Sequence, residues 1–566
     1  MIFKSDLKDA KRNAHELLNT ASSTDENTLA TMFGWMQSDA TMNRQVEVTE
    51  KLWEDSGLEE HIKKATITKG GGQYMWYNIK NLTTNIKLLK ARQSPTIGNN
   101  IRDSLQDLAA LENDALWLFT MPEMAKAWPI NMLFPTAFGL RTINNFGLPL
   151  EAFQLFRCYI SPWMNIITPV TTVLGPWMYV RKSLGWNVSF ASYVKVLLKV
   201  LSSGLRFTGN IKNDLSRIVT MLIYVVLFVY TSVQSFETAF MLQKIRKDLR
   251  QKLENIRKFV RIAESAVMTT SEQTFAAWGI VKNDIQHVHI PSHISGLHHL
   301  LTNTETQEKL KLLIKSVYVV DVCNYIKELV TSRICVPVKY SATTTTMWNM
   351  GHLLLGTGQV RNPISLHKNL IVTGPNAAGK TTYVRALFTN IILAQSLGIA
   401  CASKAIVRPV SAIGTLIRVS DTLGVASLFE AEARRCADII RKAQSMSEAG
   451  LASLFFMDEP MQSTPPIEGM STCRAVLEYL SKIQRVRTIT TTHYIQVTEI
   501  ADALPESFQN LSMVAVPLEN NRFDFSYKIQ AGSSAQCIAL ELLHDNQLPK
   551  EVMARAIELK NNMLRI

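Results

Sequence analysis

The spacing of apolar residues divides the chain into a helical first part and a last third that contains strands. Between residues 242 and 263 an apolar residue recurs at every third or fourth position, which predicts one long amphipathic helix: Leu242, Ile245, Leu249, Leu253, Ile256, Val260 and Ala263. A similar leucine spacing favours a helix near residues 101–118: Leu105, Leu108, Leu111 and Leu116. Apolar or β-branched runs at 370–373, 454–457 and 488–492 predict strands, and the run Gly70-Gly71-Gly72 predicts a turn.

The face of the long helix opposite its apolar stripe is basic: Lys244, Arg246, Lys247, Arg250, Lys252, Arg257, Lys258 and Arg261. A solvated helix face is the simpler interpretation of this pattern. The alternative is contact with a polyanion, either DNA phosphate or lipid headgroups.

Two runs without charged residues precede the amphipathic stretch. Residues 218–236 would rise about 28 Å as a helix, close to the hydrocarbon thickness of a bilayer. Residues 158–180 are also uncharged but contain Pro162, Pro169 and Pro176. Tryptophans near the ends of apolar runs are typical of interfacial anchors, here Trp128, Trp163, Trp177 and Trp186. We hypothesise a membrane hairpin through 158–180 and 218–236; the alternative is that both runs are buried core helices.

The stretch between the two runs carries several basic residues: Arg181, Lys182, Lys195, Lys199, Arg206, Lys212 and Arg217. A hairpin with its flanks in the cytosol would place these charges on the far side, against the usual bias of basic loops toward the cytosol. Insertion of 218–236 alone, or a re-entrant proline-containing run, therefore stays open.

Composition sets broader limits. A chain of 566 residues is too long for one core, so two to four domains are expected. The net charge of +13 favours a polyanionic partner. The seven cysteines are scattered without C-x-x-C spacing, which argues against a disulfide framework or a zinc site and favours a reducing, intracellular compartment. No signal peptide is recognisable at the charged N-terminus.

The motif with the clearest chemistry is Gly374-Pro-Asn-Ala-Ala-Gly-Lys-Thr381, which follows the strand run 370–373 and precedes a helical run. It matches G-x-x-x-x-G-K-[ST], a loop whose backbone N–H groups surround nucleotide phosphates. Lys380 is expected to reach the β- and γ-phosphates of ATP, and Thr381 to ligate Mg²⁺. The predicted nucleotide-binding residues are Gly374, Pro375, Asn376, Gly379, Lys380, Thr381 and Thr382.

Further residues complete a candidate ATPase site. Asp458 and Glu459 follow the run 454–457, and we expect Asp458 to hold Mg²⁺ and Glu459 to act as the general base on water. His493 follows the next strand run and is a candidate contact of the γ-phosphate or the water. Ser427 precedes a predicted helix and is the candidate residue donated to the nucleotide of a second subunit, although a simple helix N-cap is the alternative.

Taken together, these segments resemble the MutS family of mismatch-repair ATPases. Gly374–Thr381 is similar to its G-P-N-x-x-G-K-[ST] loop, and 427–432 resembles its S-T-F-x-x-E segment. Asp458-Glu459 with the residues up to Ser471 resembles the D-E run, and Thr492-His493-Tyr494 matches T-H-Y. The likeness covers roughly residues 350–566. The sequence departs from the pattern at Val425, at Ser463 where glycine is usual, and at Pro465-Pro466.

The resemblance implies an α/β P-loop ABC-type ATPase domain at the C-terminus, preceded by an α-helical core and lever region. We expect helical residues at 1–120, an apolar insertion at 121–240, lever and core helices at 241–340, the ATPase domain at 341–537 and a helical dimerisation segment at 538–566. No Phe-x-Glu of a mismatch-reading module is found in residues 1–100.

The expected function is an ATP-hydrolysing conformational switch that uses ATP and Mg²⁺, binds DNA and works as a homodimer or heterodimer. The alternative is a membrane-anchored ATPase that scaffolds or remodels a complex, with its ATPase domain on the cytosolic side. An ABC transporter is excluded because L-S-G-G-Q is missing from the signature position.

Overall fold

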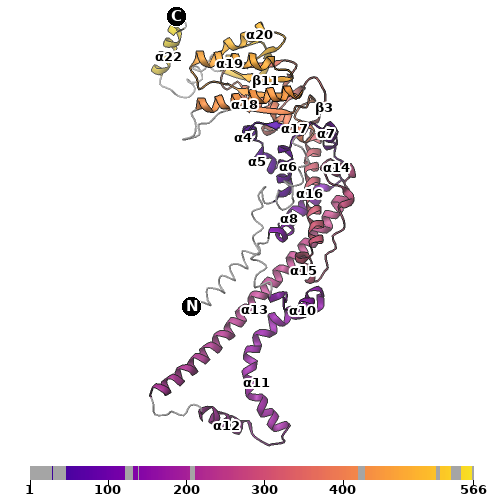
Figure 1. Ribbon diagram of the computed structural model, residues 1–566, viewed down its shortest axis with the longest axis vertical. Helices are drawn as coiled ribbons and strands as arrows, with labels where there is room; N and C mark the ends of the chain where they lie inside the picture. The colour runs from indigo at the N-terminus through magenta and orange to yellow at the C-terminus, as the bar shows by residue number, and fades with distance from the viewer. Residues whose placement is uncertain are drawn as a thin grey trace. The chain divides into compact units, whose positions relative to one another are not determined.

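The computed structural model describes residue 29 and residues 46–120, 132–137, 139–203, 211–417, 428–517, 523–536 and 550–563 (Figure 1). The chain forms two compact units. Among described residues, the first lies within 110–262 and 286–311, and the second within 24–109, 263–285 and 312–566. Trp128 and Ser427 lie outside the described residues.

The first unit is built from helices, some of which continue into the second. They are α8 (Ile101–Thr120), η3 (Arg141–Asn145), α10 (Gly147–Leu155), η4 (Phe156–Ile160), α11 (Ser161–Lys182), α12 (Phe190–Ser203), α13 (Ile211–Met268), α15 (Ser295–Thr302) and α16 (Thr304–Thr331). The amphipathic helix expected from the sequence is confirmed as the second half of α13. Its apolar positions from Leu242 to Ala263 are buried. The leucine-spaced helix near 101–118 is confirmed as α8.

Part of the basic face of α13 is neutralised within the first unit. Lys252 Nζ lies 2.7 Å from Asp114 Oδ1 and 5.1 Å from the centre of the Trp117 ring. Arg250 forms an ion pair with Glu151. Lys244, Lys247 and Arg261 are exposed. A polyanion would therefore meet a smaller basic surface than the sequence predicts.

The first part of α13 carries the uncharged run 218–236, and the apolar side chains from Leu222 to Tyr230 face solvent. Among the described residues, one helix is long and apolar enough to cross a membrane, Leu222–Met268, whose most apolar window has a mean hydropathy of 1.4 and is 17% buried. Because Leu222 to Tyr230 are all exposed, the alternative that this run is a buried core helix of the chain is wrong.

The second unit contains short helices near its beginning: α4 (Leu52–Ser56), α5 (Glu59–Lys63), α6 (Lys69–Lys80), α7 (Ile86–Arg92) and α14 (Glu272–Ala276). The expected turn at Gly70-Gly71-Gly72 is wrong, because these residues lie in α6. A Cβ on Gly70 would be 2.1 Å from the Tyr318 ring, and one on Gly72 would be 2.1 Å from the Lys63 carbonyl oxygen. The glycines therefore permit close packing rather than a change of direction.

The α/β domain of the second unit confirms the expected fold class: an α/β domain follows a helical region. Its elements are β2 (Val336–Pro337), β3 (Lys339–Tyr340), β4 (Thr346–Met350), β5 (Asn362–Ser365), β6 (Asn369–Thr373), α17 (Lys380–Ser396), β7 (Ile399–Ala400), β8 (Lys404–Val407), β9 (Ala412–Leu416), α18 (Leu428–Glu448), β10 (Ser453–Asp458), α19 (Pro466–Lys482), β11 (Val486–Thr491), η7 (Ile495–Glu499), α20 (Ile500–Ala503), β12 (Phe508–Pro517), β13 (Phe523–Ala531) and α22 (Lys550–Met563).

The main sheet has the strand order β1-β9-β10-β11-β6-β12-β13. Its neighbours pair in parallel except β12 and β13. Helices cover both faces: Phe455 and Met457 of β10 belong to the core shared with α18 and α19, whereas Phe456 packs on Phe388 of α17. Burial on both faces explains why β10 is an uninterrupted apolar run.

The sheet also includes a strand from near the N-terminus. β1 (Glu47–Val48) pairs in parallel with β9. The Thr415 hydroxyl of β9 donates to Asp55 Oδ2 at 2.6 Å, and Arg435 of α18 pairs with the same oxygen at 2.8 Å. Residues 47–55 thus belong structurally with the C-terminal domain. The domain limits expected from the sequence stay a prediction.

Candidate functional site

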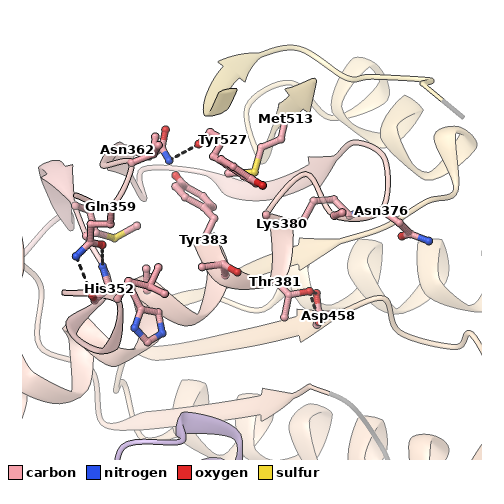
Figure 2. Close-up of a pocket in the computed structure, with 18 of the residues that line it drawn as sticks. His352, Gln359, Asn362, Asn376, Lys380, Thr381, Tyr383, Asp458, Met513 and Tyr527 are labelled. Carbon is pink, nitrogen blue, oxygen red and sulfur yellow. Dashed lines mark hydrogen bonds between the residues drawn. The ribbon is translucent and has the colours of Figure 1, made fainter. Parts of the chain in front are cut away.

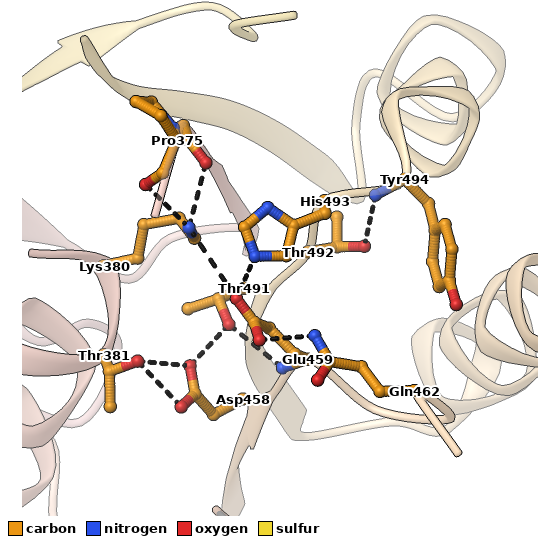
Figure 3. A network of polar contacts seen from close by, with 11 residues as sticks. Pro375, Lys380, Thr381, Asp458, Glu459, Gln462, Thr491, Thr492, His493 and Tyr494 are labelled. Atoms are coloured by element: carbon orange, nitrogen blue, oxygen red, sulfur yellow. Dashed lines mark hydrogen bonds and ion pairs between the residues drawn. The ribbon is translucent and has the colours of Figure 1, made fainter. Parts of the chain in front are cut away.

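The strand order brings three candidate segments to one edge of the sheet. β10, β11 and β6 are neighbours, with Asp458 opposite Thr491 and Thr491 opposite Val372. The carboxyl ends of parallel strands form the crevice in which open α/β sheets bind ligands. The glycine-rich loop after β6 therefore lies beside the acidic pair after β10 and the histidine after β11 (Figure 3).

The loop between β6 and α17 requires glycine at two positions. Gly374 has φ 144°, and a Cβ there would lie 2.2 Å from the carbonyl oxygen of Met513. Gly379 has φ 95° and directly precedes α17. This conformation lets the backbone turn tightly from the strand into the helix, so that the helix begins at Lys380.

Lys380 points back into the loop that precedes it. Its Nζ donates to the carbonyl oxygens of Gly374 at 2.9 Å and Pro375 at 3.1 Å, and lies 3.7 Å from Glu459 Oε1. The side chain is only 4% exposed. Burial lowers the pKa of Lys380, although Glu459 and Asp458 oppose that shift. The ammonium group is thus desolvated among acceptors that an anionic ligand would replace.

Asp458 is held by hydroxyl groups. Thr381 Oγ1 donates to its two carboxylate oxygens at 3.1 and 2.8 Å, and Thr491 Oγ1 donates to Oδ1 at 2.6 Å (Figure 3). A carboxylate beside a threonine hydroxyl is a set of hard oxygen donors, which suits Mg²⁺. The sequence predicted Thr381 and Asp458 as a pair but missed Thr491. Thr491 could have been identified only from the pairing of β10 with β11, which places it opposite Asp458.

Glu459 has a backbone conformation unusual for a side-chain-bearing residue, with φ 51°. Its N–H donates to the carbonyl oxygen of Thr491 at 3.1 Å and to the Thr491 hydroxyl at 3.0 Å. Its carboxylate forms an ion pair with His493 and accepts a hydrogen bond from Gln462. Burial raises the pKa of this carboxyl, but His493 and Lys380 outweigh burial, and the net pKa is lowered from 4.5. Glu459 is therefore ionised at neutral pH.

These residues line part of a cavity of about 1260 Å³. Asn376, Gly379, Lys380, Thr381, Thr382, Asp458 and Glu459 all contribute to its wall. His493 reaches the site through Glu459, and Pro375 through Lys380. Thus the structure brings together the predicted residues that it describes.

Part of the cavity wall was not predicted from the sequence. It includes His352, Gln359, Tyr383, Met513 and Tyr527 (Figure 2). The Gln359 side chain accepts a hydrogen bond from the backbone N–H of His352 and donates one to its carbonyl oxygen. Burial lowers the pKa of His352 to about 4, so its imidazole is neutral. These residues come from four separate segments without a shared motif, so no local pattern could have identified them.

Glu432 is a further buried acid beside the site. It is 5% exposed and accepts hydrogen bonds from the backbone N–H of Ser463, at 3.3 Å, and from the Ser463 hydroxyl. The serine found where MutS proteins usually carry glycine therefore has a specific partner. Ser427, predicted to act on the nucleotide of a second subunit, lies outside the described residues; α18 begins at Leu428.

Known proteins share sequence similarity with this chain in the C-terminal α/β domain. Residues 370–564 match the family model described as MutS domain V. The chain is 33% identical over 191 residues to the DNA mismatch repair protein MutS of Carboxydothermus hydrogenoformans, covering 34% of this chain and 22% of that protein. The MutS proteins of Leuconostoc mesenteroides and Alkaliphilus metalliredigens are each 30% identical, over 201 and 203 residues.

Each of these two alignments covers 35% of this chain, and they cover 23% and 22% of the respective relatives. The chain thus matches less than a quarter of the length of these curated relatives. The match to the family model begins in β6 and continues through α22, and so includes every predicted site residue. The C-terminal α/β domain is thus similar to domain V of the MutS family.

Proposed function

We propose that this protein is a MutS-like ATPase whose nucleotide cycle drives a conformational change. One observation carries the proposal: a buried lysine, a Thr–Asp oxygen pair and an ionised glutamate with a histidine partner lie around one cavity at the carboxyl edge of a parallel sheet. This is the set of charges that phosphoryl transfer to water requires.

The fit to ATP and Mg²⁺ rests on the side chains. Lys380 would exchange its contacts with the carbonyl oxygens of its own loop for contacts with the phosphates. At Gly374 the loop has no room for a side chain, because the carbonyl oxygen of Met513 lies too close. Thr381 and Asp458 would hold Mg²⁺, whose charge would stabilise the phosphates. Glu459 is the proposed general base, since its ionised carboxylate can accept a proton from water and His493 orients it.

We further propose that the protein acts as a dimer and binds DNA inside the cell. The named relatives are DNA mismatch repair proteins. Two subunits would share the nucleotides, with Ser427 of one subunit acting on the nucleotide of the other, and the helix α22 belongs to the proposed dimerisation segment 538–566. The exposed lysines and arginine of α13 are a modest basic surface for phosphate contacts.

Nucleotide binding by the full chain tests the proposal. We expect Lys380→Ala to weaken ATP binding at least 10-fold, because a buried cation beside the phosphates is lost. Lys368→Ala is the matched control, since Lys368 lies outside the cavity wall and its amine donates to the carbonyl oxygen of Pro505. Equal ATP affinity in the parent chain and Lys380→Ala would refute the nucleotide site.

DNA binding needs its own measurement. Phosphate contacts weaken steeply with salt, so a DNA affinity that falls between 50 and roughly 200 mM salt is expected. No binding at low salt would remove DNA as a partner and leave the ATPase proposal intact.

A second candidate function is a membrane-anchored ATPase that scaffolds or remodels a complex, with the α/β domain on the cytosolic side. The specific observation in its favour is the solvent exposure of apolar residues in the uncharged runs 158–180 and 218–236, such as Trp163, Ile167 and the stretch from Leu222 to Tyr230. Such exposed apolar surface is costly in water and marks a contact with a membrane or a partner.

A further inference from the structure

The apolar surface of α13 extends around the whole helix. Every residue from Leu222 to Tyr230 is apolar or aromatic, and each is between 38% and 70% exposed. Successive residues of an α-helix are turned by about 100°, so nine consecutive positions cover all sides. A partner protein would bury one stripe and leave the remaining sides in water. Lipid surrounds a helix on all sides, so a bilayer is the occupant that fits.

The structure brings the start of the first uncharged run to the end of the second, which the sequence alone does not show. Near the start of the first run, the Trp163 ring packs edge-on against Phe236 at the end of the second run, with ring centroids 5.2 Å apart. Seven residues further along α13, Gln243 Nε2 donates to the carbonyl oxygen of Cys158 at 2.9 Å. The start of one run therefore lies at the same level as the end of the other, as in an antiparallel pair.

Charged residues stand at corresponding ends of both runs. Arg157 and Glu237 bound them at the paired level, and Arg181 and Arg217 bound them at the other end. Between these limits the runs rise about 34 Å for 158–180 and about 28 Å for 218–236, and both are close to the roughly 30 Å hydrocarbon core of a bilayer. The second run is the more apolar, and among the described helices only the one that contains it is long and apolar enough to cross a membrane.

The far ends carry features of a membrane–water interface. Trp177 of α11 packs against Phe190 of α12 at 5.2 Å, and the Arg181 guanidinium lies 5.5 Å from the centre of the Trp177 ring. Helix α12 has a polar stripe at Ser192, Lys195 and Lys199, whereas apolar side chains such as Leu198, which is 58% exposed, cover other sides. A helix of this kind lies in the interface plane, with its lysines toward the headgroups.

From this alignment we infer that α11 and residues 218–236 of α13 cross a lipid bilayer as an antiparallel hairpin, with α12 in the interface of the opposite leaflet. The inference rests on the second candidate function, which requires only that the protein is attached to a membrane. It adds that the chain between the two spans lies on the side of the membrane opposite the α/β domain. Lys195 and Lys199 of that connection then contact the headgroups of the far leaflet.

The test is cysteine accessibility in bacterial spheroplasts that express the full chain. Asn187→Cys places a thiol at the exposed connection between α11 and α12, and Gln251→Cys places one on the exposed side of α13 beyond the paired level. The parent chain gives the background, because its described cysteines are buried. We expect a membrane-impermeant maleimide to label Asn187→Cys in intact spheroplasts and Gln251→Cys only after lysis.

The other outcomes separate the possible failures. Labelling of both variants only after lysis, with the chain in the membrane pellet, would overturn the hairpin but retain attachment. A chain that stays in the soluble fraction would overturn both. Labelling of Gln251→Cys in intact spheroplasts would place the α/β domain away from cytosolic ATP and overturn the proposed orientation. None of these results changes the ATP-binding test of Lys380→Ala.

A charge in the middle of the run gives an independent check. Val226 is 65% exposed, so Val226→Arg leaves the packing of the chain unchanged and should reduce membrane partitioning on the order of 100-fold. Met268→Arg is the matched control on the same helix, because Met268 is 74% exposed but lies far beyond the paired level. Unchanged partitioning of Val226→Arg would refute insertion of this run.

Discussion

The hydroxyl of Thr491 gives the most direct test of how the site is held together. It donates to Asp458 Oδ1 at 2.6 Å and accepts the Glu459 N–H at 3.0 Å, so one side chain positions both acids. Thr491→Val keeps the shape of the side chain and removes only these two contacts. Thr491 is fully buried, so water cannot replace the lost donor.

The size of the effect follows from the charge of the acceptor. A hydrogen bond to an ionised group contributes about 1.5–3 kcal/mol, and a buried acceptor that loses its donor bears the larger part of that range. Asp458 keeps its bonds from Thr381, and the Glu459 N–H keeps the Thr491 carbonyl oxygen. We therefore expect a loss of about 2 kcal/mol, which corresponds to roughly a 30-fold change in an equilibrium constant.

The preceding residue supplies a matched control. Thr490 is equally buried in the same strand, but its hydroxyl has no hydrogen-bond partner among the described residues. Thr490→Val removes a buried hydroxyl that makes no hydrogen bond within the described chain, so the substitution should be neutral or stabilising by about 1 kcal/mol. The two substitutions make the same chemical change and should differ in their effect by about 2–3 kcal/mol.

Hydrogen exchange measured by mass spectrometry reports the opening free energy of β11 directly. Thr491→Val should speed exchange of the β11 amides, and Thr490→Val should leave it unchanged or slow it. The Mg²⁺ concentration needed for ATP binding should also rise in Thr491→Val alone, since Asp458 is less well oriented. Equal exchange in both variants would show that the hydroxyl of Thr491 does not hold the two acids.

Three further results are expected. Glu459→Gln should keep ATP affinity and lower the hydrolysis rate about 10²–10⁴-fold, which single-turnover kinetics would measure; an unchanged rate would exclude Glu459 as the base. Because the folded pKa of Glu459 is lowered from 4.5, its ionised form stabilises the fold above the unfolded pKa, and this is lost as pH falls through the folded value. His493→Ala removes one cause of that lowering and should move the acid limb of the hydrolysis pH profile upward. Gly374→Ala should abolish ATP binding, whereas Gly450→Ala, at φ 70° with open space around it, should cost about 1–2 kcal/mol in thermal unfolding and retain binding.

The sequence was most informative where a function depends on neighbouring residues. The loop from Gly374 to Thr381 is a local conformation, and its glycines and lysine identify it without knowledge of the rest of the chain. The seam of α13 was equally accessible, because residues three and four apart share one helix face whatever they pack against.

Local pattern failed where close packing decided the outcome. The triple glycine at 70–72 is a turn by composition, yet it lies in α6 because Tyr318 and the Lys63 carbonyl approach too closely for any side chain. Likewise, an uncharged helix has the same composition in a protein core and in a lipid-facing segment. Only the exposure of Leu222 to Tyr230 separates these cases.

By itself, the sequence determined the chemical groups of the candidate site and the periodicity of its helices, because both depend on residues close together in the chain. The tertiary structure alone decided which distant groups meet. Strand register placed Thr491 opposite Asp458, loop packing brought His352 and Tyr527 to one cavity, and β1 joined a sheet formed by residues more than 300 positions later. Contacts of this kind depend on the pairing and packing of separate elements, for which a single sequence contains no local signal.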